Sequence, residues 1–150
     1  MDGIVAVATM NLVFDILQAI GLATAASLLV ALIGNRVAAV LIAVALGAAL
    51  GLLSAEERDG AWLLAPLIGA ASGALAAAAA HELFAGVRVR LGDAGSGGLI
   101  LYAAVAAALT AAGSVGFPPV GAVVFGLVLW LGYSAKRRAS EKYAGLRILR

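Results

Sequence analysis

The chain has 150 residues, of which 64% are hydrophobic and only 12% are charged, and its formal net charge is +2. A soluble domain is typically about 45–50% apolar and about 25% charged, so this composition excludes an ordinary water-soluble fold and indicates a polytopic membrane protein. The absence of cysteine excludes disulfides, zinc–thiolate sites and thiol chemistry.

The positive charge is concentrated at one end of the chain, where six of the ten Lys and Arg residues lie within the last fifteen positions. We expect these cations to face the anionic headgroups of a bilayer, and we expect no nucleic-acid partner. The N-terminus carries no cationic segment, so the first apolar run is expected to remain as a membrane helix and not to be cleaved as a signal.

The first two membrane helices are predicted from long apolar runs, because a helix needs about 20 apolar residues to cross the hydrocarbon core. The first run covers residues 4–33, and its membrane part is expected near residues 12–33. A turn at residues 34–36 follows it. The second span covers residues 37–53 and is closed by the charged loop at residues 54–60.

The third span is predicted over residues 61–87, and it is followed by the longest internal loop, which contains two arginines and the glycine-rich stretch 92–98. This loop precedes a helix N-terminus, a setting that can hold an anion, but it lacks the lysine of a nucleotide-binding loop. We interpret it as a flexible connection. The alternative is an anion site, for which a lipid headgroup is the preferred ligand.

The fourth span is predicted over residues 99–115 and the fifth over residues 119–133, after the break at residues 116–118. Pro119 fits the first helical position, where its missing N–H would be unpaired in any case. The sequence therefore predicts an all-α fold, a transmembrane bundle of five spans over residues 1–133 with a basic cytoplasmic tail at residues 134–150.

The distribution of cations predicts the orientation of the bundle. Five spans place the termini on opposite sides, and nine of the ten cations then share the side of the C-terminus, while Arg58 lies on the other. The positive-inside rule predicts an outside N-terminus and a cytoplasmic C-terminus. The aromatic residues agree, with Trp62 at an outer helix end and Tyr102, Trp130 and Tyr133 at cytoplasmic ends.

Small residues recur four positions apart in four of the spans. Such spacing permits the close helix contacts on which association in lipid depends, because hydrophobicity contributes little there. We interpret these pairs as packing surfaces within the bundle, with a homo-oligomer interface as the alternative. The pairs are Gly21 and Ala25, Gly47 and Gly51, Gly69 and Gly73, and Ala122 and Gly126.

Three polar residues share one face of the first helix, because spacings of four and three bring Asn11, Asp15 and Gln18 together. An ionisable residue within a span is costly and often functional, which makes Asp15 a candidate proton or cation site in a polar path. The alternative is an interfacial or structurally paired carboxylate, and Arg58 in the outer loop is within reach of it.

His81 and Glu82 close the alanine run of the third span and are interpreted as interfacial residues. Neighbouring residues point about 100° apart on a helix, and one histidine without cysteines argues against a metal site. General acid–base catalysis is the minor alternative. The candidates for binding lipid headgroups or anions are Arg88, Arg90, Lys136, Arg137 and Arg138.

Two segments resemble a family of small uncharacterised bacterial multi-spanning membrane proteins. They are residues 141–150, which follow a Pro-Pro break and one apolar span, and residues 14–25. These two segments contain 22 of the 150 residues, and the segment after residue 25 departs from the family pattern. It implies a bacterial inner-membrane location and carries no activity.

The sequence thus predicts a non-enzymatic protein with a structural or a partner- or lipid-binding role, with no cofactor. The alternative function is a small oligomeric transporter or channel in which Asp15 lies in a polar path. A membrane enzyme is the third possibility, and the clustered acids, bases and metal ligands that such chemistry requires are missing from the sequence.

Overall fold

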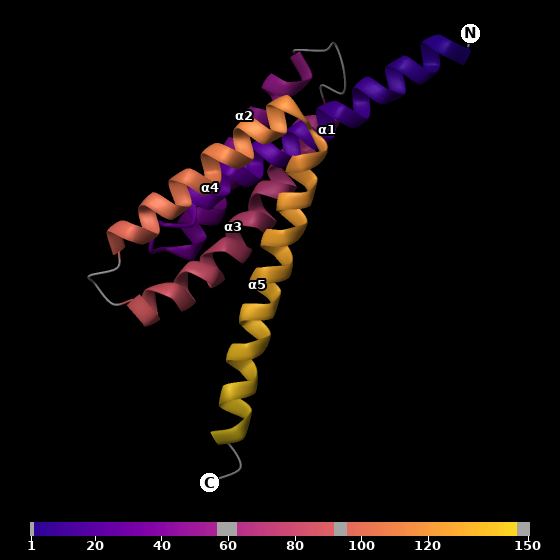
Figure 1. Cartoon of the computed structure of the whole chain (residues 1–150). Helices are drawn as coiled ribbons and strands as arrows, with labels where there is room; N and C mark the ends of the chain where they lie inside the picture. The colour runs from indigo at the N-terminus through magenta and orange to yellow at the C-terminus, as the bar shows by residue number, and fades with distance from the viewer. Residues whose placement is uncertain (1, 57–62, 92–95, 147–150) are drawn as a thin grey trace.

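The protein folds into five helices, seen in a computed structural model that describes residues 2–56, 63–91 and 96–146. The predicted all-α architecture of five helices is confirmed, and each helix is long and apolar enough to cross a membrane. The chain is a polytopic membrane protein. The helices are α1 (Asp2–Val30), α2 (Arg36–Glu56), α3 (Leu64–Leu91), α4 (Ser96–Gly116) and α5 (Pro119–Leu146) (Figure 1).

Two helix starts follow directly from the local sequence. The side-chain oxygen Oδ1 of Asn35 accepts hydrogen bonds from the backbone N–H groups of Val37 (3.0 Å) and Ala38 (3.3 Å), which makes Asn35 the N-cap of α2. α5 begins at Pro119, as its missing N–H predicts. These two signals fix the short connections before α2 and α5.

The ends of the other helices differ modestly from the prediction. The apolar part of α1 covers Thr9–Val30, three residues earlier than expected, and residues 31–33 form a closing turn in which the N–H groups of Leu32 and Ile33 donate to carbonyls three residues back. α5 continues through residue 134, the predicted start of the tail, as far as Leu146. The segment is rich in good helix formers and contains no proline, and its first glycine stands at position 145.

α1 is the central helix of the bundle. It contacts each of the other four helices, whereas α2 makes no close contact with α4 or α5 in the described parts of the chain. In its apolar window 56% of the residues are buried, against 17% in that of α5. The sequence of α1 agrees with this position, because polar residues within its span are tolerated only where protein surrounds them.

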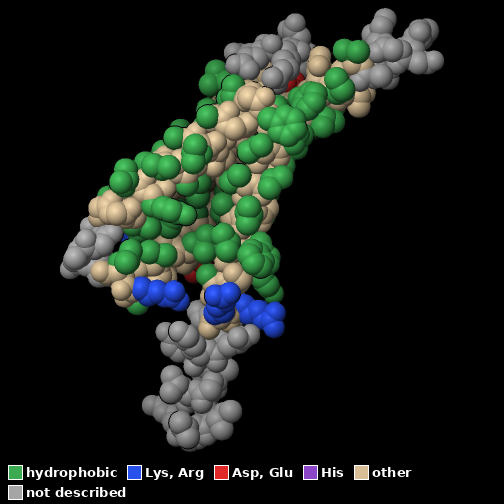
Figure 2. All heavy atoms as spheres, in the orientation of Figure 1, with side chains coloured by type: hydrophobic (Ala, Val, Ile, Leu, Met, Phe, Trp, Pro, Cys, Tyr) green, Lys and Arg blue, Asp and Glu red, His purple; other side chains and the backbone are tan. Residues whose placement is uncertain are grey.

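The helices run so that α1 begins and α5 ends at opposite ends of the bundle (Figure 1). The turn after α1, the end of α3 and the C-terminal part of α5 share one end, which is also where the described Lys and Arg side chains gather (Figure 2). We call this the cationic end. Apolar side chains cover the flanks of the visible face between the two ends.

Candidate functional site

The contact between α2 and α3 is formed by the four glycines that the sequence singles out there. A Cβ on Gly73 would lie 2.5 Å from the carbonyl oxygen of Ala43, and a Cβ on Gly51 would lie 2.7 Å from the Cα of Pro66. Gly47 and Gly69 face each other, each against the other's carbonyl oxygen. The two backbones therefore touch along the whole contact, which gives the van der Waals packing that replaces hydrophobic burial in lipid.

The close contacts of α5 fall on glycines other than the predicted one. Gly126 is exposed, with nothing within 4 Å of a Cβ there, and Ala122 is half-buried. Gly121 instead lies against Gly21 of α1, where an added Cβ would come within 2.5 Å of the Gly21 Cα. The side chain of Ser114 on α4 occupies the same junction, so α1, α4 and α5 meet at three small residues.

The three polar residues of α1 lie where the other helices enclose this helix. Asp15 is fully buried and Gln18 is 3% exposed, while Asn11 is half-buried. The interpretation of Asp15 as a solvated interfacial carboxylate therefore does not fit its surroundings. Arg58, the partner considered from the sequence, lies outside the described residues.

The other buried polar side chains of α1 are occupied with backbone carbonyls. The Thr24 hydroxyl donates to the Ile20 carbonyl of its own helix at 2.7 Å. The Ser27 hydroxyl lies 2.7 Å from the Ala23 carbonyl and 2.9 Å from that of Gly73, so it ties α1 to α3 as well. These hydroxyls satisfy their hydrogen-bonding capacity inside the bundle, as buried groups must.

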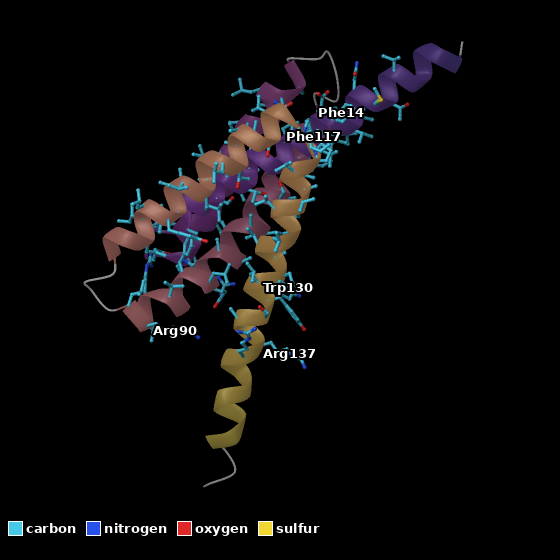
Figure 3. All side chains as sticks on the ribbon, in the orientation of Figure 1. Phe14, Arg90, Phe117, Trp130 and Arg137 are labelled. Carbon is cyan, nitrogen blue, oxygen red and sulfur yellow. The ribbon has the colours of Figure 1, made fainter. Side chains whose placement is uncertain are left out.

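The cationic end combines side chains that hold the fold with side chains that are exposed. Arg36 pairs with Glu82 at 2.9 Å, linking the start of α2 to α3. Arg88 donates from Nη2 to the carbonyl of Leu32, which ties the end of α3 to the turn after α1. The remaining candidates are exposed and are Arg90, Lys136, Arg137 and Arg138. Figure 3 shows Arg90 at the end of α3 and Arg137 on α5.

His81 lies one residue before the glutamate of this ion pair. Its Nδ1 is buried and makes no hydrogen bond within the described part of the chain. No group of three His, Cys, Asp or Glu side chains is found together among the described residues. The glycine-rich loop named from the sequence lies outside the described residues at positions 92–95, and Ser96–Gly98 form the first turn of α4.

An apolar groove of about 330 Å³ runs along α1 between α2 and α4. It exists because α2 and α4 both pack against α1 but not against each other. Every side chain that lines it is leucine or alanine. The lining residues are Leu22, Ala25, Ala26 and Leu29 of α1, Leu50 of α2, and Ala104, Ala107, Ala108 and Ala111 of α4.

A comparison of the chain with family models, with curated proteins and with solved structures finds no match. The resemblance to small bacterial membrane proteins stays a prediction.

Sequence reasoning missed two features of this geometry. In the junction of Gly21, Ser114 and Gly121, the sequence indicated Gly21 but not the other two, because the spacing of four residues selected Gly126 in α5 instead of Gly121. The groove was hidden because its two walls come from helices far apart in sequence. The signal that could have found it is the repeat of small residues at positions 104, 107, 108 and 111, which places four alanines on one face of α4.

Proposed function

We propose that the chain is a non-enzymatic subunit of the bacterial inner membrane that binds anionic lipid at its cytoplasmic face, with the N-terminus outside and the C-terminus in the cytoplasm. The observation that carries the proposal is the cationic end, where exposed Arg and Lys side chains gather at one end of a bundle that exposes many large hydrophobic side chains. Each cation near an anionic surface contributes up to about 1 kcal/mol to membrane affinity.

The supporting geometry is a closely packed bundle. Backbone contacts at glycines join α2 to α3, and small residues join α1, α4 and α5. Arg36 and Arg88 each make a contact that ties the helices together at the cationic end, and the side chains of Arg90 and of residues 136–138 are exposed there.

The experiment measures which lipids stay with the protein. We expect the purified full chain, taken from bilayers of equal phosphatidylglycerol and phosphatidylcholine, to retain phosphatidylglycerol in excess, and added salt to weaken this preference. A variant with Lys136, Arg137 and Arg138 all changed to Gln should lose much of the excess. Equal retention of both lipids by the unaltered chain would refute the proposal.

The orientation has its own test. Reporter fusions at the two termini should place the N-terminus outside and the C-terminus in the cytoplasm, because the cationic end is expected to stay inside. Fusions that place the two termini on one side, or the C-terminus outside, would contradict the proposed orientation.

A second function is favoured by one specific observation, the complete burial of Asp15 next to the nearly buried Gln18 in the central helix. A carboxyl group enclosed within a membrane span is the kind of group that proton and cation transporters use. In liposomes loaded for ion flux, Asp15→Asn should abolish transport if this function holds, whereas Asn11→Ala, at a half-buried position on the same face, should retain part of it. Absence of flux in the unaltered chain would leave the binding function alone.

A further inference from the structure

The groove along α1 has a direction that relates it to the cationic end. Its lining begins on α1 at Leu29 and extends back along the helix to Leu22. The N–H of Leu32 donates to the carbonyl of Leu29 at 3.1 Å, and the carbonyl of Leu32 accepts from Arg88. A guanidinium group therefore lies one turn of chain beyond the last lining residue of α1.

The opposite end of the groove is closed by the three-helix junction. Gly21 precedes the lining residue Leu22 and lies against Ser114, three residues beyond the lining residue Ala111. α1 and α4 thus converge just where the lining stops. Leu32, in the turn after α1, and Leu22 are ten residues apart, or about 15 Å at the helical rise, so the guanidinium and the inner end of the lining are separated by about half of the roughly 30 Å hydrocarbon core.

The groove lies on the membrane-facing surface, because Leu29 is 46% exposed and both Ala104 and Ala108 are exposed. Its lining of leucine and alanine offers no hydrogen-bonding side chain, so its occupant must be hydrocarbon. A spanning helix needs about 30 Å of contact, but the lining on α1 extends over seven residues, or about 10 Å. This length suits one acyl chain better than a helix of a partner or of a second copy.

The charge at the groove's end specifies the headgroup. The Arg88 guanidinium has five N–H donors, of which one is assigned to the Leu32 carbonyl, and the side chain is only half-buried. Guanidinium groups match phosphate geometry well, because they present paired donors in a plane. Glu82, the described acid nearest in sequence, is paired with Arg36 and does not compete for Arg88.

We infer that the groove between α2 and α4 binds one acyl chain of an anionic phospholipid from the leaflet at the cationic end, with the lipid phosphate held by Arg88. This inference rests on the proposed lipid-binding function and deepens it from a general surface affinity to a single site. The site takes its specificity for lipid from the joint presence of an apolar slot, whose lining extends about 10 Å along α1, and a guanidinium group one turn of chain beyond the last lining residue.

The test uses the full chain in detergent, native mass spectrometry, and titration with phosphatidylglycerol, phosphatidylcholine or inorganic phosphate. We expect one phosphatidylglycerol to bind at least about tenfold more tightly than phosphatidylcholine, and inorganic phosphate not to displace it. Ala108→Phe fills the groove from an exposed position and should weaken the binding of both lipids about tenfold. Ala112→Phe, one turn further along the exposed surface of α4 and outside the lining, is the matched control and should bind as the unaltered chain does.

The headgroup half of the site is tested with Arg88→Gln, which should remove the preference of the single groove site for phosphatidylglycerol, while Arg90→Gln should retain most of it. Arg88→Lys keeps the charge and should keep part of the preference, which separates loss of the site from loss of the fold. The inference is overturned if Ala108→Phe binds lipid normally, if phosphate competes fully, or if the variant changes the oligomeric mass and not lipid binding. If the unaltered chain shows no preference for the anionic lipid, the proposed function fails as well.

Discussion

Replacing Gly73 by alanine tests whether backbone contact between helices holds this bundle together. The new Cβ would lie 2.5 Å from the Ala43 carbonyl oxygen, whereas ordinary van der Waals contact begins at 3.4 Å. α2 and α3 must therefore separate by about 0.9 Å at this point, and overpacking of this kind typically costs about 1–3 kcal/mol. The carbonyl of Gly73 also accepts the hydrogen bond from Ser27, so the shift strains the contact with α1 too.

The matched control is Gly86→Ala in the same helix, where nothing lies within 4 Å of the added Cβ. Both changes gain the same helix propensity, up to about 1 kcal/mol, so the difference between the two variants isolates the packing cost. A chain of this length loses about 2–4 °C in Tm per kcal/mol, which predicts a Tm for Gly73→Ala roughly 2–12 °C below that of Gly86→Ala.

The assay is thermal unfolding of the purified variants in one detergent, followed by circular dichroism. Gly73→Leu should lower the Tm further, because it adds three more carbon atoms at the same contact. If Gly73→Ala and Gly86→Ala unfold at the same temperature, the glycine contacts do not limit stability and the packing argument is wrong.

Three further effects are expected in the same unfolding assay. Ser27→Ala removes the hydroxyl bond to the backbone of α3 and should cost about 0.6 kcal/mol, the average for such bonds in membrane helices, and an unchanged Tm would show that the bond contributes nothing. Gly21→Ala should lower the Tm strongly, because the Ser114 Cβ would lie 2.5 Å from the new methyl group. Adding Ser114→Gly should recover part of the loss. Equal Tm values for the single and double variants would exclude this contact as the cause. Glu82→Gln removes the partner of Arg36 from a solvent-accessible pair and should cost at most about 1 kcal/mol, with a smaller loss at high salt, so a loss that salt does not change would contradict an electrostatic origin.

The sequence predicts the five helices well because the physical requirement behind them is local. A spanning helix must pair its backbone hydrogen-bonding groups internally over about 20 apolar residues, so a short window of sequence is enough to predict it. The start of α5 could also be predicted, since proline fits the first position of a helix but not its interior, and α5 begins at Pro119. The end of α5 could not be predicted, because hydropathy indicates where a membrane span ends and not where the helix ends.

The packing contacts were predicted in part, and the reason lies in composition. The sequence indicates Gly47, Gly51, Gly69 and Gly73, and the structure places all four at the contact between α2 and α3. The same spacing rule selected Gly126, which is exposed, and passed over Gly121, which touches α1. In so alanine-rich a chain the spacing of small residues recurs on several faces of each helix, so a neighbouring helix must decide which face is used.

The burial of Asp15 shows most clearly what the sequence could not supply. Its depth along the chain suggested an outer interface, where water would solvate a carboxylate without any function. Its place in α1 changes that expectation, because α1 is the helix that the other four surround.

The same central position produces the groove, since two helices that flank a third without meeting leave a strip of it uncovered. The two proposed functions therefore share one structural cause. The helix that carries the enclosed carboxyl group also supplies the floor of the apolar slot, so a lipid bound against Leu22 and Leu29 would contact the same helix on which any ion path through Asp15 depends.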